Sequence, residues 1–393
     1  MGNSIAPATT GKRRIIGFDF IKTVAILLVI TVHMLGGSTL PHTWYTHIVS
    51  TLTMVCVPLF VMVNGALMLT RPFNGKKHRR RIVQLIVLTI IWKILLLVFC
   101  RFTLDYEPDL SKSSIASYLL GATPPYGNIG YTWFLDFYIG LMILYPVLKA
   151  IFDAKGTPLK YILISLLVLA VGDTFDMLYL PLSHALGLNS SVSVFGHFSS
   201  FNAFSSCSAL TAMFMIGGIV WEWHVNGEKP IYREAGGTTA LNRIVSGISS
   251  APVKSAVAIS IACFAVLFGL VSYKCEFIEP NSWDLTQKYS NVFNICLTTS
   301  IFYLLSIAHY PKPLEKFSSF MGSRTFSIYI MHIAAMNGIS ALMDAGIIPT
   351  GAGFPGAIDL LYLLSIYLIG EFLLAVLACL IEKIPYAKAL LFK

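Results

Sequence analysis

The sequence predicts an all-α membrane protein, a bundle of about ten transmembrane helices. Composition supports this fold class, because 56% of the 393 residues are hydrophobic and only 12% are charged, whereas soluble globular domains usually carry about 25% charged residues. The apolar residues also form long runs separated by polar segments. Lipid rather than water is therefore the expected solvent for most of the chain, and the bilayer is its first expected partner.

Each apolar run is long enough to cross a bilayer, because a spanning helix needs roughly 20 residues. The first run follows three basic residues, as in a signal peptide, but it is too long and lacks a small-residue cleavage site, so we expect it to remain as a helix. No polar stretch reaches the roughly 50 residues of a small domain, and the whole chain, 1–393, is expected to form one membrane domain. The expected spans are 15–36, 48–69, 82–100, 131–151, 159–177, 207–223, 255–272, 289–309, 323–344 and 358–382.

Lys and Arg are distributed unevenly between the two sides of this bundle. Short cytoplasmic loops are enriched in these residues, and most of the 28 in this chain fall in alternate loops. The intervening loops contain only Arg101, Lys112, Lys274 and Lys288. Both termini are therefore predicted to be cytoplasmic, residues 1–14 forming a short tail. The same bias accounts for most of the net charge of +9, so no nucleic-acid partner is expected.

The seven cysteines are scattered, mostly within the expected spans, and no two of them form a CxxC pair. Zinc sites and disulfide frameworks are recognised in a sequence by such paired spacings. Neither is therefore predicted, and no metal ion is expected.

Three polar residues lie in the first apolar run: Asp19, Lys22 and His33. A charged residue inside a spanning helix costs at least about 2.5 kcal/mol on insertion scales, so each is a candidate functional residue. The step from Lys22 to His33 is about three helical turns, which places both side chains on one face and roughly 16 Å apart along the axis. Asp19 precedes Lys22 by one turn, within reach of an ion pair.

This shared face indicates two sub-sites along one path. Lys22 lies toward the cytoplasm, where it would hold an anionic donor, and His33 lies toward the far side, where its imidazole could accept a proton from a hydroxyl near neutral pH. We group Asp19 with His33 as candidate catalytic residues. In the alternative interpretation, Asp19 and Lys22 only neutralise each other, and His33 makes a hydrogen bond within the bundle.

The ninth run has the same order of polar residues as the first. Arg324 lies near its cytoplasmic start and His332 near its middle, so we expect the two helices to flank one cavity. His332 is a further candidate catalytic residue, with a buried structural histidine as the alternative. Arg324 is a candidate donor ligand, although the positive-inside rule alone could place it there. Arg80 and Arg81, in a basic run before the third span, are assigned to the donor in the same way, and an ordinary cytoplasmic anchor is the alternative.

The fourth run begins with aromatic residues at the predicted outer face. Such residues collect at membrane interfaces, which would explain Trp133 without any function. A sugar, however, is bound by ring stacking together with hydrogen bonds, so Trp133 and Asp136 are the candidate acceptor-binding residues. We therefore expect the fourth helix to line the same cavity as the first and the ninth. Lys93 and Glu371, which also lie within spans, have no assigned role, and either could be paired inside the bundle.

Taken in order along the chain, these residues resemble the integral-membrane acyltransferase family three, whose mainly bacterial members acylate envelope and secreted polysaccharides. The most specific element is a basic residue, ten intervening residues and a histidine, here Lys22 and His33. Many members have arginine at the first position, and lysine keeps the charge but loses the bidentate fork. Asn64 stands where the family typically shows serine. The similar segments, which together cover nearly the whole chain, include VPLFVMVNGALML, KKHRRRIVQLIV, TWFLDFYIGLMILYPVL and SRTFSIYIMH.

The resemblance implies an enzyme that takes an acyl group, as a rule acetyl, from cytoplasmic acetyl-CoA and transfers it to a hydroxyl of a cell-envelope glycan or lipid-linked sugar. It further implies a multi-pass protein of the bacterial cell membrane, with His33 as the essential histidine. A polysaccharide transporter or export factor is the alternative, because intramembrane charges are equally expected along a transport path. Against a transporter, no inverted repeat is visible, and a membrane sensor would need a signalling domain that the sequence does not indicate.

Overall fold

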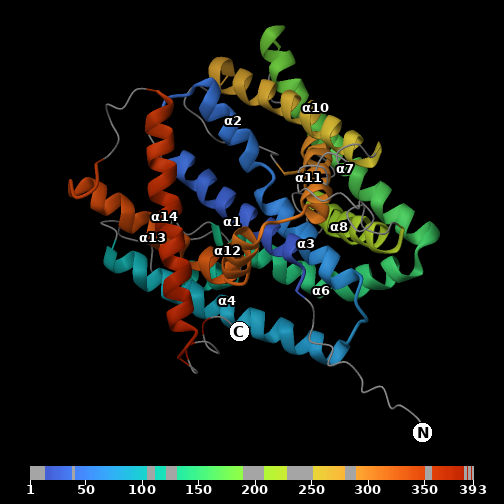
Figure 1. The fold of residues 1–393 in the computed structure, drawn as a ribbon, viewed down its shortest axis with the longest axis horizontal. Coiled ribbons are helices and arrows are strands. Elements are labelled where there is room, and N and C mark those ends of the chain that lie inside the picture. Colours follow the sequence, from blue (N-terminus) through green and yellow to red (C-terminus); the bar gives the residue numbers. More distant parts are fainter. Residues whose placement is uncertain are drawn as a thin grey trace.

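The computed structural model describes residues 14–37, 40–103, 111–120, 131–188, 208–227, 251–278, 289–349 and 356–384, together with residues 387 and 391. Every regular element in these ranges is a helix, and no strand occurs within them. The all-α prediction is therefore confirmed for the described part of the chain (Figure 1).

The helices pack together as one bundle (Figure 1). In chain order they are α1 (Ile16–Gly37), α2 (Trp44–Thr53), α3 (Cys56–Leu69), α4 (Gly75–Thr103), α5 (Lys112–Leu119), α6 (Trp133–Ala154), α7 (Gly156–Ala185), α8 (Ser208–Gly227), α10 (Ala251–Tyr273), the π-helical turn η3 (Lys274–Ile278), α11 (Val292–Ile307), α12 (Lys312–Gly322), α13 (Thr325–Asp344) and α14 (Ala357–Ile381).

Eight helical segments of the described chain are long and apolar enough to cross a membrane. Two shorter apolar helices, Ala209–Trp223 and Val292–Ile307, coincide with the two remaining spans expected from the sequence. Each expected span thus has a helix in the structure, although several begin or end at other residues. α2 and α3 together form one segment, Trp44–Leu69, and α10 continues through η3 to Ile278.

The segment Trp44–Leu69 is interrupted at Met54 and Val55, between α2 and α3. Pro58, in the first turn of α3, has no backbone N–H, so the carbonyl of Met54, one turn earlier, loses its helical partner. Asn294 of α11 replaces that partner, because its Nδ2 donates to the Met54 oxygen over 3.0 Å, and its side chain is fully buried. Neighbouring side chains satisfy freed backbone groups within membranes in this way, and the bond attaches α11 to the α2–α3 break.

α3 and α8 pack closely because each presents a glycine to the other. A Cβ at Gly65 would lie 1.8 Å from the carbonyl oxygen of Phe214, and one at Gly217 would lie 2.2 Å from that of Met62. Small residues allow membrane helices to approach until their backbones touch. This contact fixes the position of α3 within the hydrophobic core.

α1 lies inside the bundle, in contact with α2, α3, α11, α12, α13 and α14. α12, which is not one of the spans, packs along the first turns of α1 (Figure 1). The approach is close, because Thr23 Oγ1 donates to the carbonyl of Ser318 over 3.3 Å, and a Cβ at Gly322 would lie 2.6 Å from the carbonyl oxygen of Asp19. The start of α1 is therefore held by α12.

Lys93, within α4, forms a buried ion pair with Asp136 of α6. Its Nζ is 2.9 Å from each carboxylate oxygen and 2.9 Å from the carbonyl oxygen of Tyr118 in α5. The side chain of Lys93 is 1% exposed and that of Asp136 is 29% exposed. Charges within membranes pair with one another in this way, and the pair joins α4, α5 and α6.

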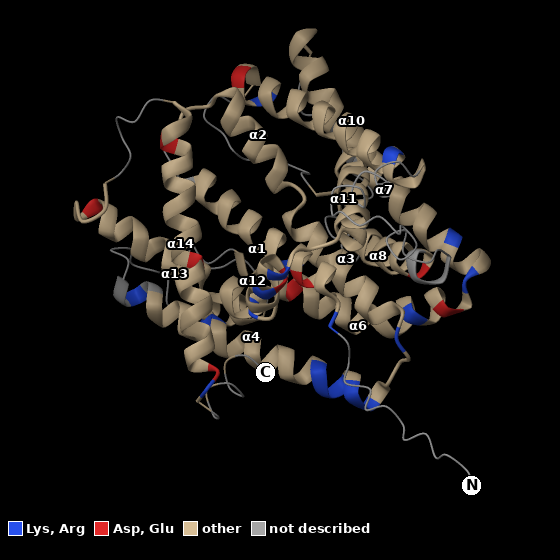
Figure 2. Ribbon diagram, viewed as in Figure 1, with Lys and Arg blue, Asp and Glu red and all other residues tan. Residues whose placement is uncertain are grey.

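Charged residues are sparse over most of the bundle (Figure 2). Lys and Arg gather at the start of α4 and at the junction of α6 with α7, both toward the lower right of the view. These are two of the segments expected on the cytoplasmic side, and the orientation of the bundle in the membrane stays a prediction.

The α3–α8 contact predicts that Gly65→Ala is strongly destabilising. The added methyl group would overlap the Phe214 carbonyl, so the two helices have to separate, and overpacking typically costs about 1–3 kcal/mol. We expect a loss of at least that size in the free energy of unfolding, measured by SDS titration in mixed micelles. Gly140→Ala in α6 is the matched control, because a Cβ there meets nothing within 4 Å. Equal stability of the two variants would contradict the close packing.

The Lys93–Asp136 pair predicts that loss of one member is more harmful than loss of both. Asp136→Leu leaves a buried ammonium group without its counter-ion, at a cost of about 3 kcal/mol. Lys93→Met combined with Asp136→Leu removes both charges and should recover most of that stability. The unfolding free energies of the wild type, the two single variants and the double variant form a double-mutant cycle. Additive losses would show that the two groups are not coupled.

Candidate active site

A cavity of about 900 Å³ lies inside the bundle, between α1, α3, α6 and α13. Pockets for small ligands have volumes of about 300–1,000 Å³, so this one can hold an extended molecule. The first, fourth and ninth spans, which were expected to line one cavity, provide three of its walls. Both Lys22 and His33 line it, and no acidic residue does so in the described part of the chain.

The Lys22 end of the cavity is positively charged. Lys22 Nζ is 2.8 Å from Asp19 Oδ1, and Arg14 pairs with the other oxygen of the same carboxylate. Asp19 is 3% exposed, whereas the Lys22 side chain is 23% exposed and reaches the cavity. Two cations thus share one carboxylate, which leaves a net positive charge beside the cavity. This end suits an anionic group of a ligand.

Asp19 was expected to act with His33, but the structure gives it a different position. The two residues lie about four turns apart on α1, roughly 21 Å along the helix axis, and the Asp19 carboxylate is occupied by Arg14 and Lys22. Asp19 therefore orients Lys22 and cannot contact His33. The structure thus gives Asp19 no contact with His33, and its catalytic role stays a prediction.

At the other end of the cavity, His33 lies beside a second histidine. The ring centroids of His33 and His332 are 5.1 Å apart, and the Tyr131 ring is 6.5 Å from the first and 4.8 Å from the second. His33 lines the cavity, whereas His332 is 0% exposed and is not among the lining residues. The structure thus brings the two predicted histidines together. Of the two, His33 lines the cavity and His332 is buried behind it.

The ring of His332 is oriented by its own helix. Its Nδ1 is hydrogen-bonded to the carbonyl oxygen of Tyr329, and because a carbonyl only accepts, Nδ1 carries the proton. Its Nε2 is buried and has no hydrogen-bond partner within the described residues. The His332 ring is therefore fixed by its own helix and packs beside the His33 ring, the two ring centroids 5.1 Å apart.

Tyr131 ties the start of α6 to α13. Its hydroxyl donates to the carbonyl of Ile330 over 2.8 Å, and the hydroxyl of Tyr329 donates to the carbonyl of Tyr131. Both tyrosines line the cavity next to the histidine pair. The wall beside His33 is therefore rigid and aromatic.

Trp133, predicted to bind the acceptor, does line the cavity. It is 41% exposed and stacks with Tyr289, their ring centroids 6.2 Å apart and their planes 26° apart. Flat aromatic faces of this kind can stack against a sugar ring. Asp136, one turn later, is not among the lining residues, and its carboxylate is held by Lys93. Its position therefore supports a structural role in place of the predicted acceptor contact.

Arg324 lies at the edge of the cavity and is already paired. Its Nη2 is 3.3 Å from Glu382 Oε2 and 3.2 Å from Cys379 Sγ, and it is not among the lining residues. Arg324 therefore does not reach the cavity in this structure, and its contact with the donor stays a prediction.

Glu371 of α14 is also buried, and its Oε2 has no hydrogen-bond partner in the described chain.

Arg80 and Arg81 are exposed in the first part of α4. Neither lines the cavity in the described part of the chain. The two arginines are thus placed outside the cavity, on the exposed surface at the start of α4. A role in attracting an anionic ligand fits this position better than a direct contact inside.

Sequence reasoning missed three groups of the site. Arg14 was counted only as a basic flank, yet it shares Asp19 with Lys22. Asn64 lines the cavity, donates to the carbonyl of Phe60 over 2.9 Å and accepts from Tyr138 over 3.3 Å. Tyr289 precedes α11 and carries no local signal of a site.

Comparison of the sequence with known protein families assigns the chain to a family of enzymes. The family described as an acyltransferase domain matches residues 15–381. No curated protein and no solved structure matches the chain. Because the match spans nearly the whole chain and includes every helix around the cavity, the protein belongs to acyltransferase family three, whose reaction is the transfer of an acyl group to an acceptor.

Proposed function

We propose that the protein is a membrane-bound O-acyltransferase that moves an acetyl group from cytoplasmic acetyl-CoA to a hydroxyl of a cell-envelope glycan or lipid-linked sugar. We place it in the bacterial cell membrane as a multi-pass protein with both termini in the cytoplasm. The observation that carries the proposal is that Lys22 and His33, on one face of α1, line the same cavity. A cation and a proton acceptor therefore lie along one continuous path.

The donor is assigned to the Lys22 end of the cavity. The phosphates of acetyl-CoA are anionic, and Lys22 with Arg14 leaves excess positive charge around the single carboxylate of Asp19. The exposed Arg80 and Arg81 raise the local positive potential at the start of α4 and would attract the donor from the cytoplasm. The thioester end would then extend toward His33.

His33 is assigned as the general base. It removes the proton from the acceptor hydroxyl as that oxygen attacks the thioester carbonyl carbon, so the new C–O bond forms while the C–S bond breaks. The protonated His33 then returns the proton to the departing sulfur, which gives the CoA thiol and the acyl ester. His332, behind His33, is a positioning residue in this scheme, because it touches the His33 ring and does not line the cavity.

The acceptor is assigned to the aromatic end of the cavity. Trp133 and Tyr289 provide stacked ring faces, and Tyr131 and Tyr329 lie beside the histidines. Sugars combine apolar ring faces with hydroxyl groups, so they suit a wall of aromatic rings that also carries polar atoms. A glycan hydroxyl bound here would lie next to His33.

The proposal predicts that His33→Ala abolishes acetyl transfer while leaving donor binding intact. General-base assistance contributes about 10²–10⁴-fold to rate, so transfer of labelled acetyl from acetyl-CoA to envelope glycans by the purified protein should fall by that factor. The affinity for acetyl-CoA, measured by calorimetry in detergent, should not change, because the donor charges are bound about three turns away on α1. His309→Ala, at an exposed histidine outside the cavity lining, is the control.

Lys22→Ala should have the opposite effect to His33→Ala, because it should weaken the binding of acetyl-CoA. It removes a charged donor contact, which is worth about 1.5–3 kcal/mol, and should weaken acetyl-CoA binding by about 10- to 100-fold, whereas Lys316→Ala on the exposed face of α12 should not. The fold should persist, because Arg14 still neutralises Asp19. Near wild-type transfer by His33→Ala, or movement of glycan across the membrane without any acetyl ester formed, would refute the proposed function.

A further inference from the structure

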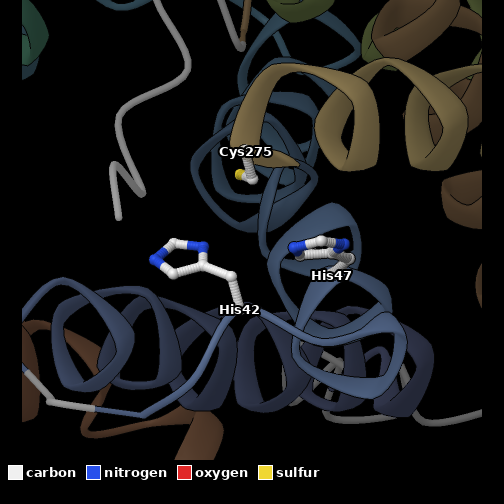
Figure 3. A group of neighbouring side chains, drawn as sticks. All are labelled: His42, His47 and Cys275. Carbon is white, nitrogen blue, oxygen red and sulfur yellow. The ribbon is translucent and has the colours of Figure 1, made fainter. Parts of the chain in front are cut away.

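Two histidines and a cysteine meet at one end of the bundle, apart from the cavity. They are His42, His47 and Cys275, and one potential ligand atom of each lies within 4.8 Å of those of the other two. Figure 3 shows both imidazole rings and the thiol arranged around one shared space. None of the three is among the residues that line the cavity, so this group is separate from the Lys22–His33 site.

Two of these residues lie in helical elements, and the third shortly precedes one. His42 shortly precedes α2, whose first turn is closed by a capping box between Thr43 and Thr46, and His47 lies one turn into the helix. Cys275 lies in η3, the π-helical turn that follows α10, and π turns occur frequently at functional sites. His47 and Cys275 are 0% and 3% exposed. α2 and α10 pack against each other, and η3 directly follows α10, so the segments that carry the three side chains are neighbours.

His47 is held by a hydrogen bond that is typical of metal-binding histidines. Its Nδ1 is 3.0 Å from Oγ of Ser272, in the last turn of α10. When Nδ1–H donates to that hydroxyl, the lone pair resides on Nε2, and outer-shell partners fix the tautomer and the ring orientation of metal ligands in this manner. The ring centroids of His42 and His47 are 6.1 Å apart, which leaves room for an ion between the ring edges.

We propose that His42, His47 and Cys275 bind a Zn²⁺ ion. Imidazole nitrogen and thiolate sulfur are preferred zinc ligands, at about 2.0–2.1 Å and 2.3 Å, so the ligand atoms of a tetrahedral site are about 3.3–3.8 Å apart. Small side-chain rotations would bring the observed group to that spacing. The thiol loses its proton on binding, and a water molecule takes the fourth position, as in zinc sites with three protein ligands.

The ion would join the start of α2 to the end of α10. α2 also contacts α1, the helix that carries His33, so this link would restrain the end of the bundle to which the acceptor is assigned. With the N-terminus in the cytoplasm, this end faces the outside, and the ion would be taken up from there. The zinc site does not depend on the identity of the acyl donor or acceptor.

The test uses the purified full-length protein after removal of metal with a chelator. Titration with Zn²⁺ should saturate at one ion per chain, and Co²⁺ should give a thiolate-to-cobalt charge-transfer band together with the visible bands of a tetrahedral site. Cys275→Ser should abolish the charge-transfer band. Ser272→Ala should keep the band but weaken metal affinity by about 10- to 100-fold, the usual effect of losing an outer-shell partner.

Two variants serve as matched controls. Cys263→Ser changes another cysteine of α10, and His184→Ala changes an exposed histidine near the same helix end; both should bind metal as the wild type does. The cobalt spectrum of the wild type tests the proposal even when Cys275→Ser does not fold. Absence of saturable zinc binding, a wild-type cobalt spectrum without a thiolate band, or a band that survives in Cys275→Ser would overturn it.

Discussion

An apolar bundle accepts charged side chains where they are paired or where they line a cavity, and this constraint accounts for Asp19, Lys22, Lys93 and Arg324. Glu371 does not follow it, because it is buried and its Oε2 has no hydrogen-bond partner in the described chain. Lys93 is paired with Asp136, and Arg324 with Glu382. Asp19 differs because it is shared between Arg14 and Lys22. The single carboxylate of Asp19 therefore does not fully neutralise Lys22 and Arg14. Among the cations of these described ion pairs, Lys22 is the one that lines the cavity. The assignment of the donor follows from this imbalance.

The distance between the two ends of the site is set by a single helix. Lys22 and His33 both belong to α1, which is enclosed by six other helices, so their spacing does not depend on the relative motion of domains or loops. The surrounding walls are also fixed: α3 by its glycine contact with α8, and the α2–α3 break by Asn294. Held in this way, His33 meets the requirement that catalytic groups sit on rigid elements with their orientation set by neighbours.

Features that repeat locally along the chain could be predicted from the sequence. The spans follow from the length of the apolar runs, and the common face of Lys22 and His33 follows from the period of one helix. Asp136 was assigned to the acceptor because it follows the aromatic residues of the fourth span. Its counter-ion, Lys93, lies on another helix, and no sequence pattern identifies this pair. The burial of His332 depends on the packing of Tyr131 and α13. The group of His42, His47 and Cys275 was missed for the same reason, because helix packing alone brings Cys275 to the histidines.

A structure of the full-length protein with CoA bound will show whether one cavity serves both the donor charges and the base. We expect CoA to occupy the cavity, with its phosphates beside Lys22 and its sulfur directed toward His33. CoA bound at another surface, or bound in the cavity with its sulfur at the Lys22 end, would rule out a shared cavity of this kind.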